Sequence, residues 1–127
     1  MSNIIKSFQK KIGITADGVF ENNTITAAMN FYKLTPLRAS HFFGQISCET
    51  NNFKNFSELC SEYAFESAIF FFEKNKLWDI CDKGIDNDTI LKITKYINGK
   101  NDLSDRIALI NKYYNILTQQ TQQAWFK

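Results

Sequence analysis

Apolar residues recur at intervals of three and four along nearly the whole chain, and this helical spacing is the feature that most limits its fold. Ile5, Phe8 and Ile12 form one such face, and Gly13 follows it, where a helix is expected to end. No segment shows the apolar-polar alternation that is typical of a half-buried strand. The sequence therefore predicts an all-α fold.

The same spacing predicts five further helices, each with a recognisable start. Candidate N-caps are Thr24, Thr35 (followed by Pro36), Ser61 and Asp88. The last helix is predicted from about Ser104, with an apolar face of Ile107, Ile110, Tyr114 and Leu117. The polar tail TQQTQQAWFK after that face is expected to fray.

Length and composition limit the classes of protein that fit. A chain of 127 residues forms one domain, or one domain with a small subdomain, and its 44% apolar content with twelve phenylalanines supplies a core without disulfides or metals. Fifteen basic and thirteen acidic residues leave a net charge of +2, without the concentrated basic stripe that nucleic-acid binding usually requires.

Cysteine and histidine usage argues against a metal or disulfide framework. The chain has three cysteines, Cys48, Cys60 and Cys81, which cannot all pair in disulfides within the chain and which show no CxxC spacing. It has one histidine, His41. We therefore expect reduced cysteines, no metal site and no cofactor. The first residues, MSNIIKSFQKK, show no long apolar segment followed by a cleavage site, so we expect no signal peptide, and no apolar run reaches the roughly 18 residues of a membrane span. The expectation is synthesis in the cytoplasm, with delivery by other means if the protein acts outside it.

The stretch FFGQISCETNNF places a carboxylate, Glu49, at the end of the third helix. On a helical projection His41, Gln45 and Cys48 share one side of this helix, the apolar residues share the other, and Glu49 lies near the border. The negative end of the helix and the nearby phenylalanines both disfavour an ionised carboxylate, so we expect the pKa of Glu49 to be raised, as a general acid needs. The alternative is an ordinary solvated glutamate at a helix end.

A second carboxylate, Glu58, follows nine residues later across a polar turn. Two carboxyl groups about 6.5–9.5 Å apart suit inverting glycoside hydrolysis, in which one acts as acid and the other as base toward a water. The alternative is that Glu58 is an exposed loop residue.

The segment RASHFFGQISCETNNFKNFSE resembles the active-site helix of family-19 glycoside hydrolases, the chitinase-like group that includes many phage endolysins. The family pattern is Ala-His-Phe-hydrophobic-Ala-Gln-x-x-His-Glu-(Ser/Thr)-Gly-Gly-Phe. The resemblance implies a reduced lysozyme-like helical domain. It also implies that Glu49 is the catalytic general acid and that Gln45 is the substrate-site glutamine one turn before it.

Two later segments extend the resemblance. ESAIFFFEKNKLWDICDKG is similar to the family's Glu-Ser-Ala-x-x-Phe-Trp helix, and ITKYINGKNDLSDRIALINKYYNIL is similar to its Ile-Thr-x-x-Ile-Asn-Gly-Gly…Asp-Arg end. The resemblance implies that Asn98 lines the sugar cleft and that Arg106 buttresses the acidic site. The alternative for Arg106 is an ion pair with Asp102 or Asp105 at the start of the last helix.

The N-terminal segment IIKSFQKKIGITADGVFENNTITAAMNFY resembles a shortened peptidoglycan-binding repeat, with the core Leu-Gln-x-x-Leu-Gly…Asp-Gly-x-Phe-Gly-x-x-Thr. The implied organisation is a peptidoglycan-binding-like segment over residues 1–34 and a lysozyme-like domain over residues 35–127. The alternative is that the first segment consists of two helices packed under the domain.

The chain also departs from these patterns. Cys48 replaces the family histidine, Asn51 and Asn52 replace the two glycines, and Glu21 replaces the glycine of the wall-binding motif. A long family segment that forms one wall of the cleft is reduced to residues 59–64. These departures leave two functions open.

The first function is a phage-type lysozyme or endolysin that hydrolyses β-1,4 bonds of peptidoglycan or a related amino-sugar glycan. The second is a catalytically inactive phage structural, assembly or regulatory protein that binds glycan or a protein partner, such as a virion protein. Either would act at the bacterial cell wall or in the virion.

Overall fold

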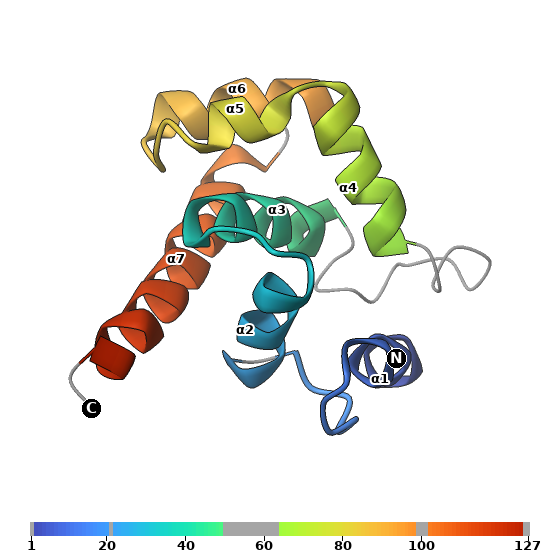
Figure 1. Cartoon of the computed structure of the whole chain (residues 1–127). Coiled ribbons are helices and arrows are strands. Elements are labelled where there is room, and N and C mark those ends of the chain that lie inside the picture. Colours follow the sequence, from blue (N-terminus) through green and yellow to red (C-terminus); the bar gives the residue numbers. More distant parts are fainter. Residues whose placement is uncertain (1, 21, 50–63, 99–101, 126–127) are drawn as a thin grey trace.

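A computed structural model describes residues 2–20, 22–49, 64–98 and 102–125. These residues form helices and no strand, which confirms the predicted all-α class (Figure 1). The helices are α1 (Ser2–Ile12), α2 (Asn22–Phe31), α3 (Pro36–Glu49), α4 (Ala64–Lys74), α5 (Leu77–Cys81), α6 (Asn87–Asn98) and α7 (Leu103–Trp125).

Helix α3 lies at the centre of the molecule, with other helices around it (Figure 1). Residues 39–47 of this helix are all buried, on its polar side as well as on its apolar side. A helix that is buried all round must satisfy its polar side chains internally, because water does not reach them. The polar side predicted for α3 therefore faces protein along this stretch.

Two adjacent phenylalanines of α3 connect two groups of aromatic rings. Phe42 packs against Phe72 of α4 and Trp78 of α5, with ring centroids 5.2 and 5.8 Å away. Phe43 packs against Phe20, 5.8 Å away, before α2. The rings of Phe42 and Phe43 lie 5.1 Å apart, edge to face, so the two groups form one continuous core.

Helices α3 and α7 cross with unusually close backbones at Gly44. A Cβ atom built on Gly44 would overlap Cγ1 of Ile110 and lie 3.1 Å from the Ile110 Cα. Both residues are buried. The absence of a side chain at position 44 therefore sets how closely α7 approaches the central helix.

Helix starts agree with the predictions in part. Thr35 caps α3 as predicted, because its hydroxyl accepts a hydrogen bond from the Arg38 amide at 3.2 Å. Asp86, not Asp88, caps α6, since its carboxylate accepts from the Thr89 amide at 3.2 Å. The prediction of Thr24 as a cap is wrong: α2 begins at Asn22, and Thr24 lies buried within it.

Two further helix predictions differ from the structure. Helix α5 was not predicted, because it is short and is separated from α4 only by Asn75 and by Lys76, whose φ is +57°. Helix α7 continues to Trp125, so the described part of the tail that was expected to fray is helical. On α7, Tyr113 rather than Tyr114 is the buried tyrosine.

The N-terminal segment packs directly on the rest of the chain. Phe8 belongs to the same buried core as the residues of α3 and α7. Glu66 of α4 pairs with Lys11 of α1 at 2.6 Å and accepts a hydrogen bond from the Tyr32 hydroxyl at 2.6 Å. Burial raises the pKa of Glu66, but the hydrogen bonds with Lys11 and Tyr32 together lower it by more than burial raises it. The pKa of Glu66 is therefore below its ordinary value. The boundary near residue 34 remains a prediction.

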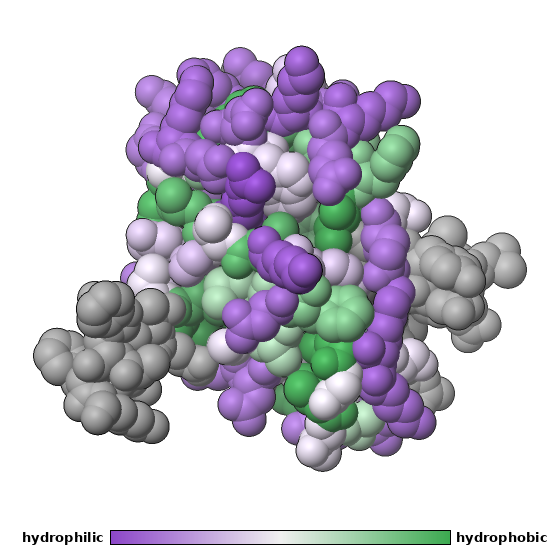
Figure 2. Space-filling view, viewed as in Figure 1, coloured by the Kyte–Doolittle hydropathy of each residue, from purple (hydrophilic) through white to green (hydrophobic). Residues whose placement is uncertain are grey.

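The surface mixes polar and apolar side chains, and polar ones predominate over α5 and α6 in the view of Figure 2. Among the residues that the structure describes, no helix has the length and apolar character needed to cross a membrane.

The Gly44 crossing yields a stability prediction. Helix propensity alone favours Gly44→Ala by about 1 kcal/mol, but the added methyl group must displace Ile110, and such overpacking costs about 1–3 kcal/mol. We expect a net loss in the free energy of unfolding, measured by urea denaturation. Ser67→Ala, on the exposed face of α4, is the control and should change stability little. A Gly44→Ala protein as stable as wild type would contradict the close crossing.

Candidate functional site

Gln45 connects three helices through its buried side-chain amide. Its Oε1 accepts a hydrogen bond from Nη1 of Arg106 at 2.6 Å, and its Nε2 donates to Oγ1 of Thr94 at 3.0 Å. The Thr94 hydroxyl in turn donates to the Ile90 carbonyl at 2.8 Å. Gln45, Thr94 and Arg106 all have exposed fractions of 0%. This chain of hydrogen bonds is therefore shielded from water, where each bond is stronger and each unpaired group costs more.

Two of the predicted site residues, Gln45 and Arg106, belong to this network. The structure brings the two side chains together, although they are 61 positions apart in the sequence. The alternative partners of Arg106, Asp102 and Asp105, are exposed, whereas Arg106 is buried. Because both predicted residues are fully buried, they are suited to positioning neighbouring groups rather than to touching a sugar directly.

Glu49 and Asn98 are the last residues of α3 and α6, and both helices run in the same direction in Figure 1. Glu49 is four residues beyond Gln45, and Asn98 is four residues beyond Thr94. Positions four apart lie on the same helix face. Since Gln45 is hydrogen-bonded to Thr94, Glu49 and Asn98 each lie one turn beyond that contact. Glu58, the predicted second carboxylate, lies outside the described residues.

His41 and Cys48, predicted on the same side of α3 as Gln45, have different surroundings. His41 is fully buried, and its Nε2 donates to the Gly84 carbonyl at 2.6 Å. Burial lowers the pKa of His41, and the Gly84 hydrogen bond and the charges of Asp86 and Asp82 only partly oppose this. The imidazole is therefore neutral at pH 7. Cys48 is half-buried and not in a disulfide.

The N-terminal segment contains a second polar network, centred on Gln9, that sequence reasoning missed. The Gln9 Nε2 lies 2.8 Å from Oδ1 of Asp17 and 2.9 Å from Oγ1 of Thr24, and its Oε1 accepts from the Gly18 amide at 2.9 Å. Gly18 has a φ of +79°, which glycine adopts without strain. The backbone bends at Gly18, and Asp17 and Gly18 form the N-terminal turn between α1 and α2. The resemblance contained the signal, since Gln9 and the Asp-Gly pair are both motif positions.

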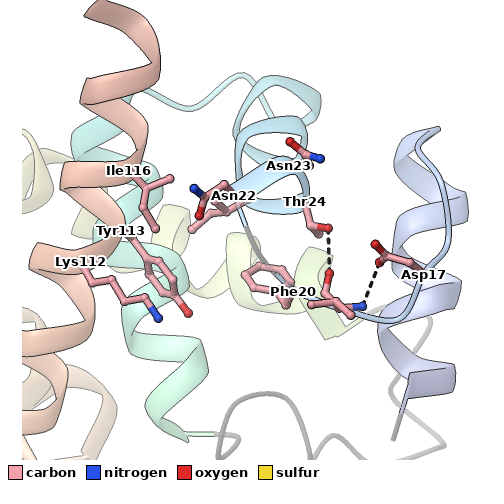
Figure 3. A pocket seen from close by; sticks show the side chains of 10 residues that line it. Asp17, Phe20, Asn22, Asn23, Thr24, Lys112, Tyr113 and Ile116 are labelled. Atoms are coloured by element: carbon pink, nitrogen blue, oxygen red, sulfur yellow. Dashed lines mark hydrogen bonds between the residues drawn. The ribbon is translucent and has the colours of Figure 1, made fainter. Parts of the chain in front are cut away.

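A pocket of about 360 Å³ lies between this turn, α2 and α7 (Figure 3). Its described lining combines polar, charged and aromatic residues: Asp17, Val19, Phe20, Asn22, Asn23, Thr24, Ile25, Lys112, Tyr113 and Ile116. Figure 3 shows Lys112 and Tyr113 on the α7 side, Asp17 on the opposite side and Phe20 between them. No sequence motif predicted this pocket, because its lining comes from segments that only the fold brings together.

Hydrogen bonds and burial fix the chemical state of two pocket residues. The backbone N–H of Val19 and the side chain of Gln9 lower the pKa of Asp17, so Asp17 is a carboxylate at neutral pH. Burial raises the pKa of Tyr113, and its hydroxyl lies 2.8 Å from the hydroxyl of Ser47 on α3. Tyr113 is therefore protonated at neutral pH.

Within the described ranges, no three or more histidine, cysteine, aspartate or glutamate side chains gather in a way that could hold a metal ion.

The buried Gln45–Arg106 pair predicts strong energetic coupling. Gln45→Leu removes an acceptor from a buried guanidinium, and we expect a loss of about 3 kcal/mol in the free energy of unfolding. Arg106→Met is also destabilising, but the double variant removes both polar groups and should lose less than the sum of the single variants. Urea denaturation of all four proteins measures this coupling. Additive losses would show that the two side chains act independently.

The neutral state of His41 predicts a pH dependence of stability. Because its folded pKa is below the ordinary value of 6.5, the unfolded chain takes up this proton first as the pH falls. Stability contributed by neutral His41 is complete above pH 6.5 and decreases as the pH falls toward the folded pKa. We expect the free energy of unfolding to fall between about pH 6.5 and pH 5 in wild type and less in His41→Gln. Equal slopes would contradict a buried neutral imidazole.

Comparison with known proteins gives the chain no family assignment: no family model, no curated protein and no solved structure matches it.

Proposed function

We propose that the protein is a small lysozyme-type glycoside hydrolase of the phage endolysin kind, which cleaves β-1,4 bonds of peptidoglycan with Glu49 as proton donor. The observation that supports this most is the buried Arg106–Gln45–Thr94 network one helical turn before both Glu49 and Asn98. It provides a rigid base beneath the ends of α3 and α6, which are the positions that the family resemblance assigns to the acid and to a sugar contact.

In this mechanism each residue has one task. Glu49 gives its proton to the glycosidic oxygen as the bond to the anomeric carbon breaks, and Asn98 contacts the bound sugar. A water attacks the same carbon from the opposite side and gives its proton to Glu58, so the configuration is inverted. Gln45 and Arg106 are positioning residues, because their buried hydrogen bond holds the end of α3 relative to the start of α7.

Two physical influences on Glu49 oppose each other in this arrangement. The C-terminal end of a helix favours the protonated carboxyl group, whereas a nearby guanidinium favours the carboxylate. Arg106 donates to Gln45, one helical turn before Glu49, so the proposed arrangement brings its charge close to the carboxyl group. The basic limb of the pH–rate profile, where the proton donor loses its proton, measures which influence is greater.

The inactive alternative also has a supporting observation. Gln45 is hydrogen-bonded to both Arg106 and Thr94 inside the core, so this network stabilises the fold whether or not Glu49 is catalytic. A protein that had lost hydrolysis but kept a glycan-binding or protein-binding surface would retain the same network.

Clearing of purified peptidoglycan tests the proposal. We expect Glu49→Gln to reduce the rate by about 10²- to 10⁴-fold, which is the usual contribution of a general acid. Glu73→Gln, which changes an exposed glutamate of α4, is the matched control and should keep wild-type activity. If wild type does not clear the substrate while it binds it in a pull-down, the inactive alternative is correct.

A further inference from the structure

Helix α4 carries phenylalanines on two opposite sides. Phe72 lies on the inner side, packs against Phe42 and is 2% exposed, whereas Phe70 and Phe71 are 64% and 37% exposed. Figure 1 shows α4 at the edge of the molecule, so its outer side faces away from α3. A helix that is apolar all round is usually covered all round. The outer side of α4 therefore has the character of a surface that another molecule covers.

The exposed residues on this outer side follow one helical stripe. Ser67, Phe70, Phe71 and Lys74 are all exposed, and the last three follow Ser67 by three, four and seven positions. This is the spacing with which a helix packs against a second helix. We call these four residues the α4 stripe. Single exposed apolar residues are common on protein surfaces, but two adjacent phenylalanines within such a stripe indicate an interface.

We propose that the α4 stripe binds the same stripe of a second copy of the protein, with the two α4 helices antiparallel. The inference goes beyond the proposed function and does not require the hydrolytic activity.

The charges around the stripe favour a second copy over a partner of one charge sign. The charged residues of α4 are Glu66, Glu73 and Lys74, and Glu66 pairs with Lys11 of α1 at 2.6 Å. Two acidic and two basic side chains thus balance. An anionic membrane or a nucleic acid is attracted by an excess of basic residues. A surface that carries both signs equally can instead be complementary to itself.

The order of these charges along α4 selects the antiparallel arrangement. Glu66 precedes the two phenylalanines, and Lys74 follows them. If antiparallel helices meet at the phenylalanines, Lys74 of one copy lies level with Glu66 and Ser67 of the other. Ser67 is small, so Lys74 can reach past it to Glu66, whose side chain is 37% exposed. Parallel helices would instead bring like charges together, which opposes association.

The size of the stripe predicts a weak dimer. Phe70 and Phe71 together expose about as much surface as one whole phenylalanine, roughly 150–250 Å². A standard interface buries about 800 Å² of each partner. We therefore expect a Kd of about 0.1 mM, in the range of transient complexes.

Sedimentation equilibrium of the full-length protein, from about 10 µM to 1 mM, tests the proposal. We expect a monomer–dimer equilibrium in wild type and a Kd about tenfold higher in Phe70→Gln, because a central aromatic residue is costly to remove from an interface. Tyr96→Gln is the matched control, since Tyr96 is an aromatic residue of α6 that is 54% exposed. It should leave Kd unchanged. Phe70→Gln should keep the wild-type circular dichroism spectrum and urea midpoint, which separates lost association from lost folding.

A charge reversal tests the antiparallel arrangement. Lys74→Glu places a negative charge level with Glu66 of the other copy and should raise Kd, with a smaller effect at high salt. Lys95→Glu, which changes an exposed lysine of α6, is the control and should not raise Kd. An unchanged Kd in Lys74→Glu would overturn this arrangement.

Three results would overturn the interface itself. These are a wild-type monomer at all concentrations, a dimer that Phe70→Gln does not weaken, and equal weakening by Tyr96→Gln. If the protein stays monomeric but binds phosphatidylglycerol vesicles, and Phe70→Gln abolishes that binding, the stripe binds lipid rather than a second copy. Peptidoglycan clearing by a protein that stays monomeric would refute the interface and leave the proposed function standing.

Discussion

The hydrogen bond between Gln45 and Arg106 is the interaction on which the arrangement of α3, α6 and α7 depends. A guanidinium with no exposed surface requires acceptors inside the protein, and Gln45 provides one at 2.6 Å. Gln45 can do so only while α7 begins beside the end of α3, and its own N–H group ties Thr94 of α6 to the same point. The three helices are therefore fixed relative to one another by polar contacts that tolerate little displacement.

Around α3, apolar packing makes the core compact, whereas hydrogen bonds fix the positions of the helices relative to one another. The rings of Phe42 and Phe43 connect the aromatic groups on its two sides, and Gly44 brings α7 close. These contacts give the fold its compact centre but would permit some sliding, because hydrophobic burial is not directional. Gln45 and His41 add directional bonds to Arg106 and Gly84, and these define one register.

The sequence predicted the helices well and the networks poorly, for physical reasons. Spacing of apolar residues indicates which face of a helix is buried, so the face of α1 formed by Ile5, Phe8 and Ile12 could be predicted directly. It does not report long-range polar contacts: nothing local indicates that Gln45 lies beside Arg106 or that Gln9 holds Asp17. The family resemblance named the first pair as site residues, but only the fold shows that both are buried. Helix α5 was not predicted because five residues are too few to show a periodic pattern of apolar residues.

The N-terminal turn depends on a single amide, and this has a consequence for chemical ageing. Gln9 serves as donor and acceptor at once, and a carboxylate at the same position would lose every donor. Spontaneous deamidation of Gln9 would create that carboxylate next to Asp17, so that attraction would become repulsion within the turn. At Gln45 the same reaction would instead give Arg106 an anionic neighbour. The same slow reaction would thus weaken the turn at Gln9, whereas at Gln45 it would exchange the hydrogen bond to Thr94 for an ion pair with Arg106.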